Sequence, residues 1–336
     1  MTMAPSRKAS VDLARPAGGE IRLRLLDRAP FLIACLMLAL LISAYGSLRV
    51  GVFTSEELNL DTAAAMTLLL AATGQTIVLL RGGIDLSIGG MISLGTVIAA
   101  TRFGENPWLT AYWAALIVLL GALVGVANGV LMTALRLQPF LVTLATWSIL
   151  SGAALLILPT DGGSLPSGWM AFGSAAWLGL SSSVWLLFVL VAFWLWFRRT
   201  RLGIAIRATG SNERSAFLSG VSPMFINAAT YGLSGVFAAL AALYLTTQTG
   251  AGSPTIGKDY ILPSVAAAVI GGISLFGGRG GLIGTMIGAY ILTIIGNLVF
   301  VLSISSYWQP IVSGVILLVS VLASSIAERS ARRSLT

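Results

Sequence analysis

The chain has 336 residues, of which 57% are hydrophobic and 10% are charged, and its net charge is +8. Soluble domains are about 45–50% apolar and about 25% charged, so this composition excludes an ordinary soluble enzyme. One cysteine excludes an internal disulfide framework, and the lack of histidine removes the commonest metal ligand, so we expect no metal site.

The apolar residues fall into runs of the length that an α-helix needs to cross about 30 Å of hydrocarbon. Backbone polar groups must be hydrogen-bonded within the segment in lipid, so the sequence predicts an all-α, polytopic membrane bundle. We expect about ten transmembrane helices, at residues 29–48, 62–80, 87–101, 108–134, 139–158, 184–197, 224–246, 262–276, 282–302 and 308–326.

The basic residues predict the orientation. With ten spans both termini share one side, and the opposite loops hold only three of the 20 lysines and arginines, namely Arg49, Arg102 and Lys258. Cytoplasmic loops carry such an excess, so both termini are expected in the cytoplasm, and the charge orients the chain rather than binding nucleic acid. We expect a basic cytoplasmic tail (1–28), one transmembrane permease domain (29–326) and a second cytoplasmic tail (327–336).

Two hydrophilic loops interrupt the apolar pattern. Residues 159–183 are rich in glycine and serine and are expected on the periplasmic side. Residues 198–223 are expected in the cytoplasm, with a helix from about residue 212 to 218. Asn212 is suited to cap it and Glu213 to occupy its first turn, while Gly220 and Pro223 would end it.

The motif GGIDLSIGG (82–90) places an acidic residue between glycines and between two apolar runs. Glycines there permit a broken helix or a re-entrant turn. Asp85 would cost about 2.5–3.5 kcal/mol within a bilayer, so it should face protein or water. It could cap the next helix or pair with Arg81, or it could contact substrate or act in gating.

Other polar or amphipathic residues inside the spans are candidates for the translocation path or its gate, namely Gln75, Asn128 and Trp147. Small residues every fourth position let helix backbones approach closely, either within one subunit or between subunits. Glycines with this spacing are Gly121, Gly125, Gly129, Gly284 and Gly288.

The chain has no ATP site of its own. A P-loop requires Gly-Lys followed by Ser or Thr, but Lys8 is followed by Ala9 and Lys258 by Asp259. No catalytic set and no pair of intramembrane carboxylates is present, so we expect neither an enzyme nor an ion-coupled pump.

Several segments together resemble the permease subunits of bacterial sugar ABC importers, the branch of the ribose, xylose, arabinose and galactose permeases. These segments are GGIDLSIGG (82–90), LQPFLVTLAT (137–146), RATGSNERSAFLSGV (207–221), VIGGISLFGGRGGLIGTMIGA (269–289) and SYWQPIVSGVILLVSV (306–321). The resemblance implies a multi-pass protein of the bacterial inner membrane that imports a monosaccharide or related polyol.

The resemblance also implies partners. A second permease copy or paralogue would complete the path, cytoplasmic ATPase subunits would bind ATP and Mg, and a periplasmic sugar-binding protein would deliver the solute. Residues 207–221 resemble the family's coupling segment, whose residues here are Gly210, Asn212, Glu213, Ala216, Ser219 and Gly220.

This sequence departs from the family pattern in that Glu213 comes one position early. The alternatives are a secondary transporter or channel, or an ABC permease for an autoinducer-like furanoside, a nucleoside or a branched-chain amino acid.

Overall fold

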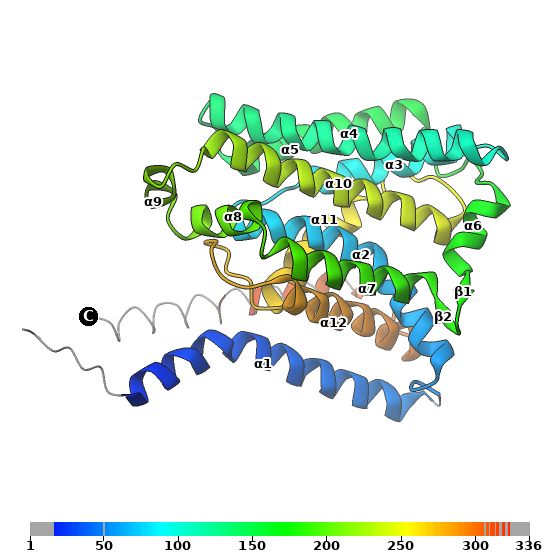
Figure 1. Ribbon diagram of the computed structural model, residues 1–336. Coiled ribbons are helices and arrows are strands. Elements are labelled where there is room, and N and C mark those ends of the chain that lie inside the picture. Colours follow the sequence, from blue (N-terminus) through cyan, green and yellow to red (C-terminus); the bar gives the residue numbers. More distant parts are fainter. Residues whose placement is uncertain are drawn as a thin grey trace, which may run out of the picture.

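The computed structural model describes residues 17–49 and 51–305 together with isolated positions between 307 and 322, and only the backbone of residues 17–29. Helices packed side by side form a polytopic bundle (Figure 1). The helices and strands are α1 (Ala17–Leu48), α2 (Ser55–Arg81), α3 (Ser87–Arg102), α4 (Pro107–Ala134), α5 (Pro139–Ile157), α6 (Ser167–Ser174), β1 (Ala176–Trp177), β2 (Leu180–Ser181), α7 (Ser182–Phe197), α8 (Arg201–Ser211), α9 (Glu213–Leu218), α10 (Pro223–Thr249), α11 (Lys258–Ile270) and α12 (Leu282–Val301).

Six of the described helices are long and apolar enough to cross a membrane, namely α1 from Pro30, α2, α4, α5, α10 and α12. A seventh span results if α7 and α8, which meet at a bend of 73°, are counted as one. The expected tenth span and the tail 327–336 fall largely or wholly outside the described residues, so the count of ten stays a prediction.

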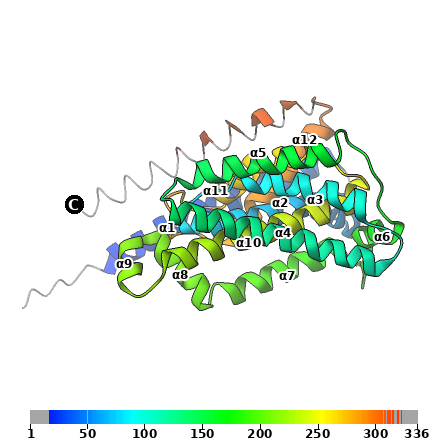
Figure 2. The same cartoon turned by 90° about the horizontal axis from the view of Figure 1, so that it is seen from above.

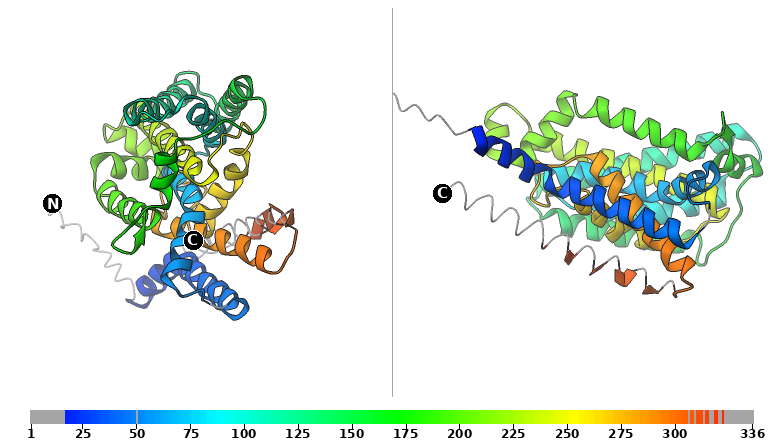
Figure 3. Two further views of the ribbon diagram at one scale, coloured as in Figure 1. Left: turned by 90° about the vertical axis from the view of Figure 1, so that its right-hand side faces the viewer. Right: turned by 90° about the horizontal axis from the view of Figure 1, so that it is seen from below.

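The first helix is longer than the sequence predicted. It begins at Ala17 instead of residue 29, so the second half of the expected tail is helical. The segment from Glu20 to Arg28 is rich in Leu and Arg, which favour helices, and contains no proline. Seen along the bundle, α1 stands at its edge (Figure 3).

The second helix forms the centre of the bundle. Of its most apolar stretch of 18 residues, 89% is buried. The helix packs against α10, α11, α12, α7 and α8, and the view from above shows it among them (Figure 2). Thr54 caps its start by accepting a 3.3 Å hydrogen bond from the backbone N–H of Glu57. Gly82, with φ of +91°, ends it in the left-handed conformation that glycine favours. This helix therefore contacts most of the bundle.

Two helices, α3 and α11, have only 16 and 13 residues and are not among the six spans. The expected span 262–276 is wrong at both ends, since α11 begins at Lys258 and stops at Ile270. The following loop to α12 contains Gly272, Gly277 and Gly278 with positive φ, a conformation that a continuing helix does not contain.

The two ends of the bundle carry different structures. At one end lie α8 and α9, and at the other lie α6 and the hairpin of β1 and β2 (Figure 1). The hairpin turns through Leu178 and Gly179, both with positive φ, as in two-residue hairpin loops. The sequence predicted α9 but neither α8 nor α6, because each lies in a segment that reads as a polar loop.

Candidate functional site

The short helix α9 has the capping that the sequence predicts. Oδ1 of Asn212 accepts a 2.9 Å hydrogen bond from the backbone N–H of Ser215. The helix ends at Leu218, with Ser219 as its C-cap, and Gly220 follows with a φ of +85°. Pro223 then begins α10. The helix is thus bounded at both ends by residues that permit a sharp change of chain direction.

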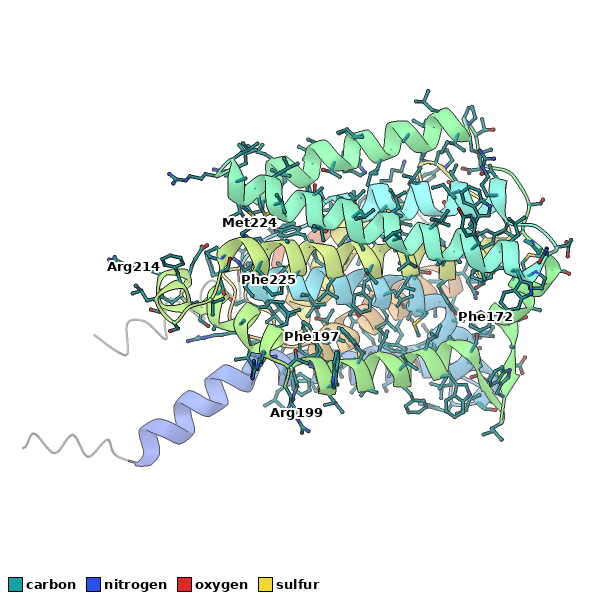
Figure 4. The ribbon with its side chains drawn as sticks, turned by 45° about the horizontal axis from the view of Figure 1, so that its top comes forward. Phe172, Phe197, Arg199, Arg214, Met224 and Phe225 are labelled. Atoms are coloured by element: carbon teal, nitrogen blue, oxygen red, sulfur yellow. The ribbon has the colours of Figure 1, made fainter. Side chains whose placement is uncertain are left out.

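The outer face of α9 carries exposed apolar side chains. Phe217 is 60% exposed and Leu218 is 77% exposed, and Phe225 at the start of α10 is 63% exposed. Arg214, Met224 and Phe225 lie together at this end of the bundle (Figure 4). We call Phe217, Leu218 and Phe225 the α9 surface. Ala216 is buried and fixes the inner face of α9.

A glycine contact seats α8 against the core. A Cβ atom at Gly210 would clash with the carbonyl oxygen of Leu80, and that oxygen accepts a 2.9 Å hydrogen bond from the backbone N–H of Gly278. Three parts of the chain meet here, namely residues 207–221, the end of α2 and the loop before α12. The end of α2, the loop before α12 and the segment 207–221 therefore form one junction.

Arg81 at the end of α2 binds two other helices. Its Nη2 donates a 2.9 Å hydrogen bond to Oε1 of Glu213 in α9, and its Nε donates one of 2.9 Å to Oδ1 of Asn227 in α10. Nδ2 of Asn227 in turn donates to Oγ1 of Thr133 in α4, at 2.8 Å. The hypothesis that Arg81 pairs with Asp85 is wrong, because the arginine points to Glu213 instead.

Asp85 lies in the break between α2 and α3 and is buried. Oδ1 accepts hydrogen bonds from the backbone N–H and the hydroxyl of Ser87, the first at 2.9 Å, and Oδ2 accepts one of 2.7 Å from Ser234 of α10. The bond from the Ser87 N–H gives the first backbone donor of α3 an acceptor. The carboxyl group therefore fastens the break to α10.

The hydrogen bonds continue from Ser87 into α4 and α5. Nδ2 of Asn128 donates to the Ser87 hydroxyl at 3.1 Å, and Thr146 donates to Oδ1 of Asn128 at 2.6 Å. Asn128 and Asp85 thus belong to one buried cluster. Sequence reasoning missed the hydroxyl members of this cluster, although serine and threonine inside apolar spans were a usable signal.

The two other path candidates are not hydrogen-bonded to this cluster. Gln75 of α2 is fully buried, and neither polar atom of its side chain has a hydrogen-bond partner in the described part of the chain. Trp147 of α5 is half-buried, and its backbone abuts Gly90 of α3. Gly90 leaves no room for a side chain there.

The spaced glycines all pack inside the chain. A Cβ atom at Gly121, Gly125 or Gly129 would clash with backbone carbonyl oxygens of α10, so the backbones of α4 and α10 are in direct contact. Gly288 lies in the same way against Ala267 of α11, and Gly284 against Gly271, which directly follows α11. Close approach of backbones is the use of small residues that membrane helices favour.

A second polar cluster lies at the far end of the bundle and was not predicted. Glu57 accepts a 2.8 Å hydrogen bond from the hydroxyl of Tyr45 and forms an ion pair with Arg49 at 2.8 Å. Asn297 donates to Asp61 at 2.7 Å, beside a cavity of about 230 Å³ that all five residues line. These contacts join α1 and α12 to the start of α2.

Comparison with known proteins identifies relatives over most of the chain. Residues 62–321 match the family described as "Branched-chain amino acid transport system / permease component". The ribose import permease protein RbsC of Escherichia coli (strain K12) is 36% identical over 297 residues, which are 86% of this chain and 91% of the relative.

Two further relatives have other named solutes. The D-allose transport system permease protein AlsC of Escherichia coli (strain K12) is 33% identical, over 85% of this chain and 88% of its own. The autoinducer 2 import system permease protein LsrC of Photorhabdus laumondii is 33% identical, over 79% and 80%. No solved structure matches the chain.

Proposed function

This chain belongs to the family of transport-system permease components matched over residues 62–321, and on that premise we propose that it is the membrane subunit of an ATP-driven importer. Its solute would be a monosaccharide or a related polyol, since the relatives with 33–36% identity carry the names of ribose, allose and autoinducer 2 import systems.

We propose ten spans with both termini in the cytoplasm, which places α8 and α9 on the cytoplasmic face. The arginines of the segment 198–223 support this orientation, because cytoplasmic loops carry the excess of basic residues. The hairpin and the polar cluster of Glu57 then lie on the periplasmic side, where a sugar-binding protein would dock.

ATP hydrolysis takes place on a separate subunit under this proposal, since the lysines of this chain do not form a P-loop. Two permease copies, or one copy and a paralogue, form the path between them. The ATPase, with its bound ATP and Mg, docks on the cytoplasmic face and changes the conformation of the permease pair.

One observation carries the proposal for the docking site. Within the α9 surface, Phe217 and Leu218 are exposed on a short capped helix outside the bundle. Exposed apolar side chains with polar surroundings mark protein interaction sites more often than isolated surface positions do. The helix thus presents a compact apolar surface to a soluble partner, and the coupling residues Gly210, Asn212, Ser219 and Gly220 hold its position.

The test is to scramble residues 211–219 and to reconstitute the permease with its ATPase and binding protein in liposomes. We expect the ATPase to be lost from the membrane and ATP-dependent uptake of D-ribose to stop. Scrambling residues 176–181, the hairpin at the opposite end, is the matched control and should leave the ATPase bound. Uptake that persists with the scrambled α9, or that follows an ion gradient without ATP, would refute the mechanism.

The family description favours a second solute class, branched-chain amino acids. The same liposomes distinguish the classes, because labelled leucine would then be imported and labelled D-ribose or D-allose would not.

A further inference from the structure

We propose that Arg81 is a positioning residue that connects movement of α9 to the buried break at Asp85. The proposal rests on the function proposed above, in which the ATPase moves α9. It adds to that function a specific path within the permease, which begins at the ion pair of Arg81 with Glu213.

Arg81 is placed to receive movement from α9. Its side chain is 15% exposed, whereas that of Glu213 is 56% exposed, so the pair joins a surface helix to the bundle interior. The guanidinium holds Glu213 and Asn227 with two different nitrogens, and Asn227 holds Thr133. One side chain therefore connects α9, α2, α10 and, through Asn227, α4.

The same arginine directly precedes the break. Gly82 and Gly83 follow it, and Asp85 is four residues further on. On α10, Ser234 binds Asp85 and lies two helical turns beyond Asn227, so α10 holds both the residue before the break and a residue within it. The backbone at Gly82 and Gly83 lies between these two contacts. A shift of Arg81 relative to α10 would therefore change the conformation of the backbone at these two glycines.

A buried hydroxyl between the two contacts is left without a partner. Tyr231 lies one turn beyond Asn227, and among the described residues its hydroxyl has no hydrogen-bond partner. It lies against Gly83, where a Cβ atom would clash with it. An unpaired buried hydroxyl is costly, which favours a second arrangement of the break in which Tyr231 donates to Asp85. Under this proposal the break has two arrangements, the one in the structure and one in which Tyr231 is bonded to Asp85.

A second route for movement from the segment 207–221 to α2 runs through the backbone, because Gly210 of α8 contacts the carbonyl oxygen of Leu80. The two routes are distinguished by Glu213→Gln, which removes the charge of the ion pair and leaves the Gly210 contact unchanged. Arg81→Lys keeps the positive charge, but one ammonium group does not reproduce the fork that reaches Glu213 and Asn227 together. Arg136→Gln is the control, since Arg136 is an exposed cytoplasmic arginine between α4 and α5.

The experiment measures two quantities for the permease reconstituted with its ATPase and binding protein: ATPase retention, and D-ribose imported per ATP hydrolysed. We expect E213Q and R81K to retain the ATPase and to lower the import ratio about two- to fivefold, in line with a partly exposed ion pair. R136Q should match the wild type. An unchanged ratio in E213Q overturns the proposal, and loss of the ATPase in E213Q overturns it by placing Glu213 in the docking surface.

A second measurement needs no partner subunit. Spin labels are attached at Leu137→Cys and Phe217→Cys in a Cys35→Ser background, with the permease alone in lipid nanodiscs. We expect E213Q to broaden the distance distribution between α9 and the α4–α5 loop, and an unchanged distribution overturns the link. Failure of the wild-type complex to import any sugar would instead refute the proposed function, so the two failures are separable.

Discussion

Ser234 donates a 2.7 Å hydrogen bond to Oδ2 of Asp85, which joins the middle of α10 to the break between α2 and α3. The residues are 149 positions apart in the chain, and both are buried. A buried carboxyl group without partners is costly, so the broken helix depends on a hydroxyl that α10 supplies.

We predict that Ser234→Ala lowers the free energy of unfolding by about 1–3 kcal/mol, because one oxygen of Asp85 then lacks its donor. The measurement is the melting temperature in detergent, followed by tryptophan fluorescence. Ser148→Ala is the control, since Ser148 is exposed on α5 and its hydroxyl donates to the carbonyl of Leu144 one turn earlier. Equal melting temperatures for the two variants would contradict the prediction.

The glycine contact between α4 and α10 gives a second prediction. Gly125→Ala places a methyl group against the carbonyl oxygen of Tyr231, and overpacking of this kind costs about 1–3 kcal/mol. Gly152→Ala in α5 meets no atom within 4 Å and should be neutral or slightly stabilising. The melting temperatures of the two variants are compared, and a stable G125A protein would show that α4 and α10 can separate without cost.

The α9 surface gives a third prediction. Phe217→Ala should weaken ATPase binding about tenfold, since a central aromatic residue in an interface contributes on the order of 1–2 kcal/mol. The measurement is titration of nanodisc-bound permease with the ATPase. Leu156→Ala on α5, also strongly exposed, is the control and should bind like the wild type. The surface assignment is wrong if both variants bind equally.

The far polar cluster gives a fourth prediction. Glu57→Gln removes the charged acceptor shared by Tyr45 and Arg49, and we expect a loss of about 1–3 kcal/mol in stability. Glu56→Gln, an exposed neighbour in the same helical turn, should change nothing measurable. High salt should reduce the difference between the variants, because the Arg49 side chain is 45% exposed. A difference that is independent of salt would point to packing instead.

Local patterns in the sequence predicted local structure well. Asn212 followed by Glu213 predicted the start of α9, and glycines around Asp85 predicted the break, because capping and backbone freedom depend on adjacent residues. The bounds of α4 and α5 were predicted to within one residue, since each begins at a proline and is mostly apolar.

Long-range partners were not predictable in the same way. Arg81 binds Glu213 and Asn227 at separations of 132 and 146 residues, whereas the sequence alone offered only its neighbour Asp85 as one possible partner. The helix α8 was missed because its arginines resemble those of a loop. Its buried positions Gly203, Ile206 and Thr209 become informative only once the core is known.

The backbone contact between α4 and α10 also has a consequence for biosynthesis. The ribosome completes α4 well before it begins α10, and at about 5–20 residues per second the delay is on the order of ten seconds. During that interval the groove formed by Gly121, Gly125 and Gly129 faces lipid or the insertion machinery without its permanent neighbour. The nascent chain therefore passes through a stage in which α4 is already made and α10, against whose backbone it packs, is not.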